Sequence, residues 1–110
     1  MLQEIISEVK KLRYEEVRND SSRLFEFVIR ADRTSELCSV LERHFGPPWK
    51  PAGENPTQEM NERVLIYGGV RKDQTLYYSK QNNASNYAML WPWANGILIT
   101  VKISEAAQKR

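Results

Sequence analysis

The sequence predicts an α+β fold in which two helices cover one face of an antiparallel or mixed sheet of about five strands. Three observations predict this two-layer class: two amphipathic helical segments, alternating hydrophobic residues typical of strands, and a second half that turn residues divide into short strand-like segments. The expected order is helix, strand, helix and then four strands. A chain of 110 residues has the size of one domain. We therefore expect a single domain over residues 1–103, followed by a frayed tail at 104–110.

The first half of the chain supplies the two helices and one strand. A helix is predicted where apolar residues recur on one helical stripe, at Leu2, Ile5, Ile6, Val9 and Leu12. Over residues 23–31 the period changes to two, which predicts a strand with the core-facing positions Phe25, Phe27, Ile29 and Ala31. A second helical stripe follows and ends at Gly46-Pro47-Pro48; it carries Leu37, Val40, Leu41 and Phe45.

The second half begins with a connection over residues 46–61 that holds four prolines and two glycines, so we expect it to be ordered but irregular. Four strands are then predicted over residues 62–68, 74–80, 86–93 and 97–103. The dipeptide Asn95-Gly96 favours a two-residue type I′ turn between the last two of them. That turn pairs Trp91 with Thr100 and Met89 with Lys102, and it assigns every side chain of this hairpin to one face of the sheet.

One face of this hairpin carries the residues that we single out as a candidate binding site. They are mostly aromatic: Tyr87, Met89, Trp91 and Trp93, bordered by Trp49 and Lys102. Large apolar patches are rare on the surface of monomers, and Trp and Tyr are favoured anchors of protein interfaces. The alternative is that the 46–61 connection folds across this face and buries it as a second core.

The composition argues against a dedicated nucleic-acid-binding protein and against a membrane-spanning one. The net charge of +2 is far below that of dedicated nucleic-acid-binding proteins. The sequence has no apolar run of the roughly 18 residues that a membrane-spanning helix needs, and its first residues lack the apolar core of a signal peptide. We therefore expect a cytoplasmic protein that does not enter a membrane.

The sequence offers few residues for catalysis or metal binding. The one cysteine, Cys38, and the one histidine, His44, lie on the same predicted helix about 240° apart around its axis, so they do not form a nucleophile–base pair. No motif implies a metal or an organic cofactor. We therefore expect a protein that is not an enzyme.

The leading prediction is a non-enzymatic interaction module whose aromatic face binds a protein partner or a second copy of the chain. A first alternative is a domain that binds single-stranded nucleic acid through a basic hairpin loop and an aromatic strand residue, namely Arg71, Lys72 and Tyr77. A second alternative is a small enzyme of unknown reaction.

Overall fold

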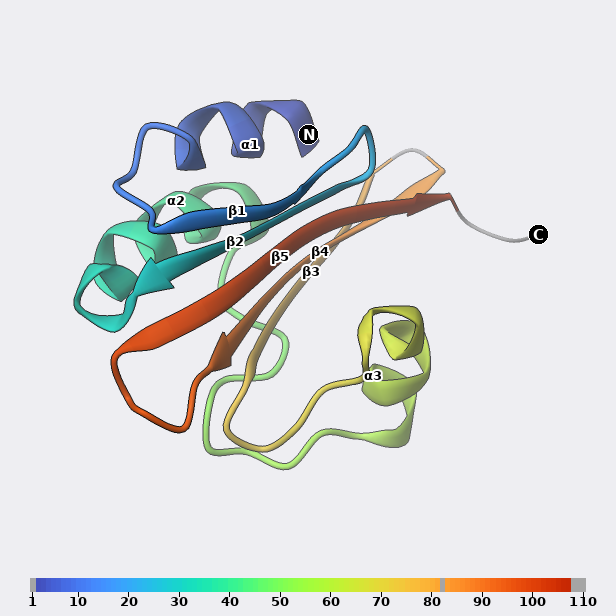
Figure 1. Ribbon diagram of the computed structural model, residues 1–110. Coiled ribbons are helices and arrows are strands. Elements are labelled where there is room, and N and C mark those ends of the chain that lie inside the picture. Colours follow the sequence, from blue (N-terminus) through green and yellow to red (C-terminus); the bar gives the residue numbers. More distant parts are fainter. Residues whose placement is uncertain (1, 82, 108–110) are drawn as a thin grey trace.

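The computed structural model describes residues 2–81 and 83–107 and confirms the α+β class (Figure 1). Five strands form one sheet in the order β1-β2-β5-β4-β3, and every neighbouring pair is antiparallel. The strands are β1 (Glu16–Asp20), β2 (Leu24–Arg30), β3 (Thr75–Gln81), β4 (Ala84–Pro92) and β5 (Leu98–Ala107). The helices are α1 (Leu2–Val9), α2 (Thr34–Phe45), the short α3 (Gln58–Arg63) and the 3-10 turns η1 (Ala31–Arg33) and η2 (Leu65–Tyr67).

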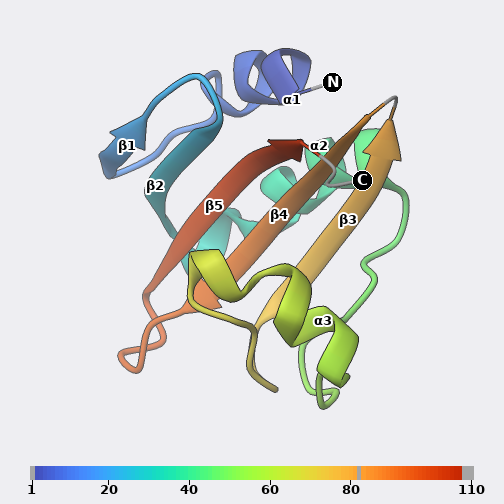
Figure 2. The same ribbon diagram turned by 90° about the vertical axis from the view of Figure 1, so that its right-hand side faces the viewer.

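The two long helices cover one face of the sheet, as predicted, whereas α3 lies on the other (Figure 2). The main core lies between the sheet and α1 and α2, where Phe25, Phe27 and Ile29 of β2 are fully buried. The expected inward positions Phe25, Phe27 and Ile29 are therefore confirmed, whereas Ala31, the fourth expected position, lies in η1 and is only partly buried against this core. We call this side of the sheet the first face and the side of α3 the second face.

The hairpin register that Asn95-Gly96 predicts is confirmed, because Trp91 pairs with Thr100 and Met89 with Lys102. The turn itself differs from the expected two-residue type I′ form. Gly96 N donates to Trp93 O at 3.0 Å, and Asn95 Oδ1 accepts hydrogen bonds from the backbone N–H groups of Ile97 and Leu98. The Asn95 side chain therefore replaces the main-chain bond of the expected turn.

The strand predicted over residues 62–68 is wrong, because this segment forms the end of α3 and the turn η2. The Thr57 hydroxyl accepts a hydrogen bond from Met60 N at 3.2 Å and begins the helix. Gln58 bonds to Glu62 and Arg63 to Glu59, which are neighbours one turn apart on a helix. This capped, paired segment lies partly inside the connection that we expected to be irregular throughout.

Strand β1 was not predicted, because its sequence EVRND has no buried face and all five side chains are exposed. It lies at one edge of the sheet, and its pairing with β2 has an irregularity between Val17 and Asn19. Charges and bulges of this kind discourage further strand pairing at an edge. The other edge, β3, is met by the chain at Lys50, which pairs with Leu76 and follows Pro47 and Pro48. Pairing of another strand is therefore discouraged at β1, and the chain at Lys50 already occupies the start of the β3 edge.

The frayed tail expected at 104–110 is wrong for residues 104–107, which continue β5 between two paired neighbours. Ser104 pairs with Leu24 of β2, and Ala107 pairs with Ala84 of β4. Residues 108–110 lie outside the described residues.

The connection between α2 and α3 is held against the sheet by a buried lysine. Lys50 is only 1% exposed, and its Nζ donates hydrogen bonds to three backbone carbonyls, those of Pro51, Lys72 and Gln74, at 2.9, 3.0 and 2.6 Å. Burial lowers the pKa of the Lys50 ammonium group. The three carbonyl acceptors offset part of that desolvation and join the connection to the start of β3.

Helices α1 and α2 are joined by an ionic contact that makes stability depend on pH. Glu8 of α1 contacts Arg43 and His44 at the end of α2. The hydrogen bond with His44, aided by the charge of Arg43, holds the pKa of Glu8 below its ordinary value. A lowered carboxyl pKa in the folded state stabilises the fold above the unfolded pKa of about 4.3, and this contribution is lost as the pH falls.

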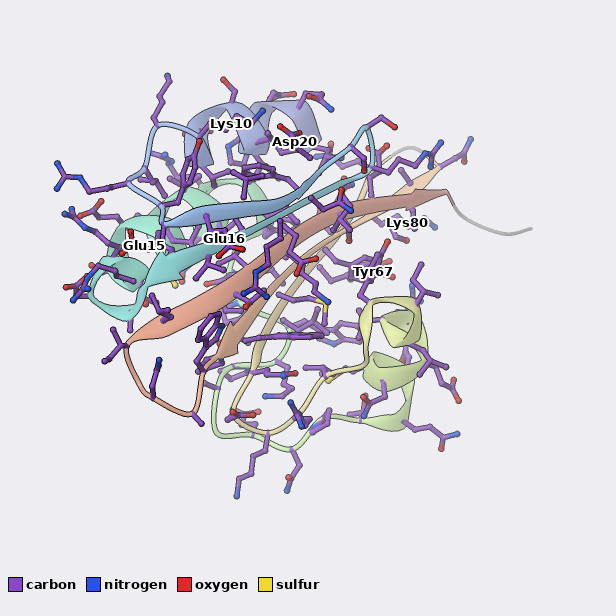
Figure 3. The ribbon with its side chains drawn as sticks, viewed as in Figure 1. Lys10, Glu15, Glu16, Asp20, Tyr67 and Lys80 are labelled. Carbon is purple, nitrogen blue, oxygen red and sulfur yellow. The ribbon has the colours of Figure 1, made fainter. Side chains whose placement is uncertain are left out.

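We therefore expect Glu8→Gln to be less stable than the wild-type protein at neutral pH, with the difference shrinking as the pH falls toward about 3. Urea unfolding at a series of pH values measures this difference. Glu15→Gln is the control for the loss of one negative charge, because Glu15 (labelled in Figure 3) is exposed and makes no ion pair within the described residues. If the free energies of unfolding of the wild-type protein and Glu8→Gln differed by the same amount at every pH, the charge of Glu8 would not contribute to stability.

Candidate functional site

The second face of the sheet carries a separate cluster of apolar side chains. Its buried members are Met60, Val64, Val70, Leu76, Tyr87 and Met89, and packed against them are Trp49, Tyr67, Tyr78 and Trp91. The part of the chain that follows Gly46, including α3 and η2, therefore covers much of the predicted aromatic face. Tyr87 and Met89 are only 3% and 1% exposed, as expected from the alternative in which the connection buries this face as a second core.

The other four predicted site residues are half-buried and lie around this cluster. Trp49 packs on Tyr78 with ring centroids 5.4 Å apart. Trp93 Nε1 donates to Thr100 Oγ1 at 2.8 Å, and the guanidinium of Arg18 lies 5.3 Å from the centroid of its ring. Both side chains are thus held by intramolecular contacts.

Lys102 and Trp91 meet at the point where η2 rests on the sheet. The Nζ atom of Lys102 lies 3.8 Å from the centroid of the Trp91 ring and donates to Tyr67 O at 2.9 Å. Gly68, the residue after η2, lies against the ring of Trp91, so that a Cβ atom added there would be 2.6 Å from Cη2 of Trp91. The buried indole N–H of Trp91 has no hydrogen-bond partner among the described residues.

Two exposed residues beside this contact were not predicted from the sequence. Leu65 and Ile66 of η2 are 69% and 79% exposed and are the most exposed of the large hydrophobic side chains in the described part of the chain. Tyr67, the third residue of η2, turns inward instead and lies between η2 and the sheet, with its ring 6.2 Å from that of Tyr87 (Figure 3). We call Leu65, Ile66, Tyr67 and Trp91 the η2 patch.

Leu65 and Ile66 were missed because residues 62–68 were assigned to a strand, in which alternate side chains would be buried. The signal that could have found them was the helix-starting threonine at Thr57, followed by charged pairs at helical spacing and closed by Gly68-Gly69. A short helix that ends at residue 63 leaves the two aliphatic residues outside its apolar stripe.

The alternative nucleic-acid contacts do not share a surface. Arg71 and Lys72 are exposed in the turn before β3. Tyr77 is 1% exposed, belongs to the first-face core and donates a hydrogen bond to Glu42 of α2 at 3.1 Å. Burial and the neighbouring Cys38 and Glu42 raise the pKa of Tyr77. This ring is therefore not available for stacking on a base, and its hydroxyl stays protonated at neutral pH.

The one cysteine and the one histidine are both in contact with other parts of the fold. Cys38 is a partly buried residue against the first-face core, and His44 is engaged with Glu8. Within residues 2–81 and 83–107, no group of three or more His, Cys, Asp or Glu side chains is close enough together to bind a metal ion. In the same part of the chain, no helix has the length and apolar character needed to cross a membrane.

Fold and site together define a two-layer α+β domain with an extra short helix over part of its second face and a small exposed apolar patch beside that helix. Comparison with protein-family models, curated proteins and solved structures found no match to this chain.

Proposed function

We propose that this domain is a non-enzymatic interaction module that binds a protein partner through the η2 patch. The observation that carries the proposal is the exposure of Leu65 and Ile66 on a turn that is itself firmly held. Gly68 N and Gly69 N donate to Leu65 O and Val64 O, each at 3.0 Å, and Lys102 bonds to Tyr67 O. The two aliphatic side chains are thus presented on a rigid support, which reduces the entropy lost on binding.

The composition of the patch supports a protein partner. Exposed aliphatic side chains gain about 25 cal/mol for each Å² that a partner removes from water, and the adjacent Trp91 is the kind of residue that dominates binding energy. Because charges and an irregular register discourage pairing at β1, and Lys50 already pairs at the start of β3, side-chain packing is a better route to association here than strand addition.

The positive charge of Lys102 beside the patch favours a different protein over a second copy. A symmetric dimer has a self-complementary interface, so a contact centred on the η2 patch would bring two Lys102 side chains together. Like charges that face each other across an interface oppose association.

The test removes the two exposed aliphatic side chains and leaves the tryptophans in place. We expect Leu65→Ser/Ile66→Ser to fold with stability close to that of the wild-type protein, since both side chains are exposed, and to lose at least tenfold in partner retention. Nuclease-treated lysate of the source cells is passed over the wild-type protein and each variant, and the retained proteins are quantified. Val17→Ser/Ile97→Ser removes two other exposed aliphatic residues and is the matched control.

Proteins that the wild type and the control retain, and the Leu65→Ser/Ile66→Ser variant loses, are the expected result. Equal retention by all three proteins would contradict the proposal, as would binding that depends on nucleic acid. Sedimentation of the purified protein tests self-association separately, and a dimer that the serine variant dissolves would replace the protein-partner proposal with self-association.

A further inference from the structure

We infer that the partner segment that binds the η2 patch carries a carboxylate next to its apolar residues, and that Lys102 is the residue that selects it. This inference depends on the proposed function and adds the chemistry of the partner. It is carried by the position and the charge balance of one side chain, Lys102, and it commits to an acidic, apolar peptide segment as the occupant.

Lys102 is placed beside the patch by the sheet register. On β5 it pairs with Met89 on one side and with Glu26 of β2 on the other, so its side chain is on the second face. The side chain bends over Trp91 and reaches the end of η2, where it bonds to Tyr67 O. Its charged end is therefore next to both the half-buried indole and the turn that carries Leu65 and Ile66.

Three cations of the second face lie over aromatic rings, and two of them also have a carboxylate. Arg18 lies over Trp93 and pairs with Glu16 at 3.1 Å. Arg63 lies over Tyr78 and pairs with Glu59 at 3.2 Å. For Lys102, no carboxylate of the described residues is within ion-pair distance, although Glu26 is its neighbour on the adjacent strand.

An uncompensated cation at an apolar patch constrains what can cover the patch. A purely apolar partner would remove water from the Lys102 ammonium group and return no charge, which is unfavourable. A partner carboxylate would instead pair with it in a site that bound apolar groups make less polar, where the attraction is stronger than in water. The cation therefore discriminates in favour of acidic segments and against basic ones.

The probe is a library of random peptides, selected for binding to the folded wild-type protein and to each variant in parallel. We expect the wild type to enrich peptides in which Asp or Glu accompanies a pair of large apolar residues. Lys102→Glu should reverse this preference toward Lys or Arg, and Lys102→Met should bind the wild-type peptides about tenfold more weakly. Lys11→Glu, the same charge change at an exposed position next to α1, is the control and should select as the wild type does.

The outcomes separate the two proposals. Apolar peptides that are enriched without an acidic preference, or a preference that Lys102→Glu leaves unchanged, would overturn the role of Lys102 and keep the patch as the binding surface. Selection that Leu65→Ser/Ile66→Ser leaves unchanged, or no enrichment on the wild type, would overturn both. Thermal unfolding of each Lys102 variant, and the retained binding of reversed-charge peptides by Lys102→Glu, distinguish altered selection from loss of the fold.

Discussion

Replacing Lys50 with methionine is expected to lower the free energy of unfolding by about 2 kcal/mol, although the substitution keeps most of the length of the side chain. The ammonium group bonds to three carbonyls, and that of Gln74 would lose its donor inside the protein. The carbonyls of Lys72 and Pro51 keep the hydrogen bonds from Gly53 N at 2.8 Å and from Glu54 N at 3.4 Å. One buried acceptor without a donor, which costs roughly 1–3 kcal/mol, accounts for the expected loss.

Urea unfolding of Lys50→Met measures this loss, and Lys72→Met, at an exposed lysine of the neighbouring turn, is the control with an expected change below about 0.5 kcal/mol. Because Lys50 also joins the connection to β3, the variant should expose Trp49 and change its fluorescence before global unfolding. If the two methionine variants were equally stable, the buried hydrogen bonds of Lys50 would have no net effect on stability.

The second large effect is expected at Gly68. Its backbone φ of 108° is one that residues with a Cβ atom rarely adopt. In Gly68→Ala the added methyl carbon would also be 2.6 Å from Cη2 of Trp91. The backbone strain is about 1 kcal/mol, and the displacement of η2 or of the packed indole adds roughly 1–3 kcal/mol. We expect Gly68→Ala to lose about 3 kcal/mol in total and to weaken partner binding, because it shifts the turn that presents Leu65 and Ile66.

A matched glycine separates the two causes. Gly53 has a φ of 94°, and an added Cβ there would have no atom within 4 Å, so Gly53→Ala should lose only the strain of about 1 kcal/mol. Chemical denaturation of both variants gives the difference, which we assign to the contact with Trp91. Equal losses would mean that Trp91 and η2 move apart freely, and the η2 patch would then lack the rigid support that the proposed function requires.

The binding site was only partly predictable from the sequence. Alternation in the last hairpin placed Trp91, Trp93 and Lys102 on one face, and the register together with the hydrogen bond from Trp93 to Thr100 agrees. Whether that face was open depended on where residues 46–68 lie, which is a long-range question that local patterns do not answer. The connection covers Tyr87 and Met89, leaves Trp91 half-buried and exposes Leu65 and Ile66 instead.

By itself the sequence determined the elements whose hydrophobic period is strong. These are the two amphipathic helices, the alternating strand β2 and the last hairpin, where burying one face requires apolar residues at fixed intervals. It did not determine β1, which has no buried side chain and exists because its backbone pairs with β2. Only the tertiary structure decided that Lys50 is buried, since a lysine in a proline-rich segment is expected to be solvated until three carbonyls are brought around it. The tertiary structure also decided the surroundings of Lys102. Its positive charge is given by the sequence, but its neighbours Glu26 and Met89 lie beside it because β5 pairs with β2 and β4.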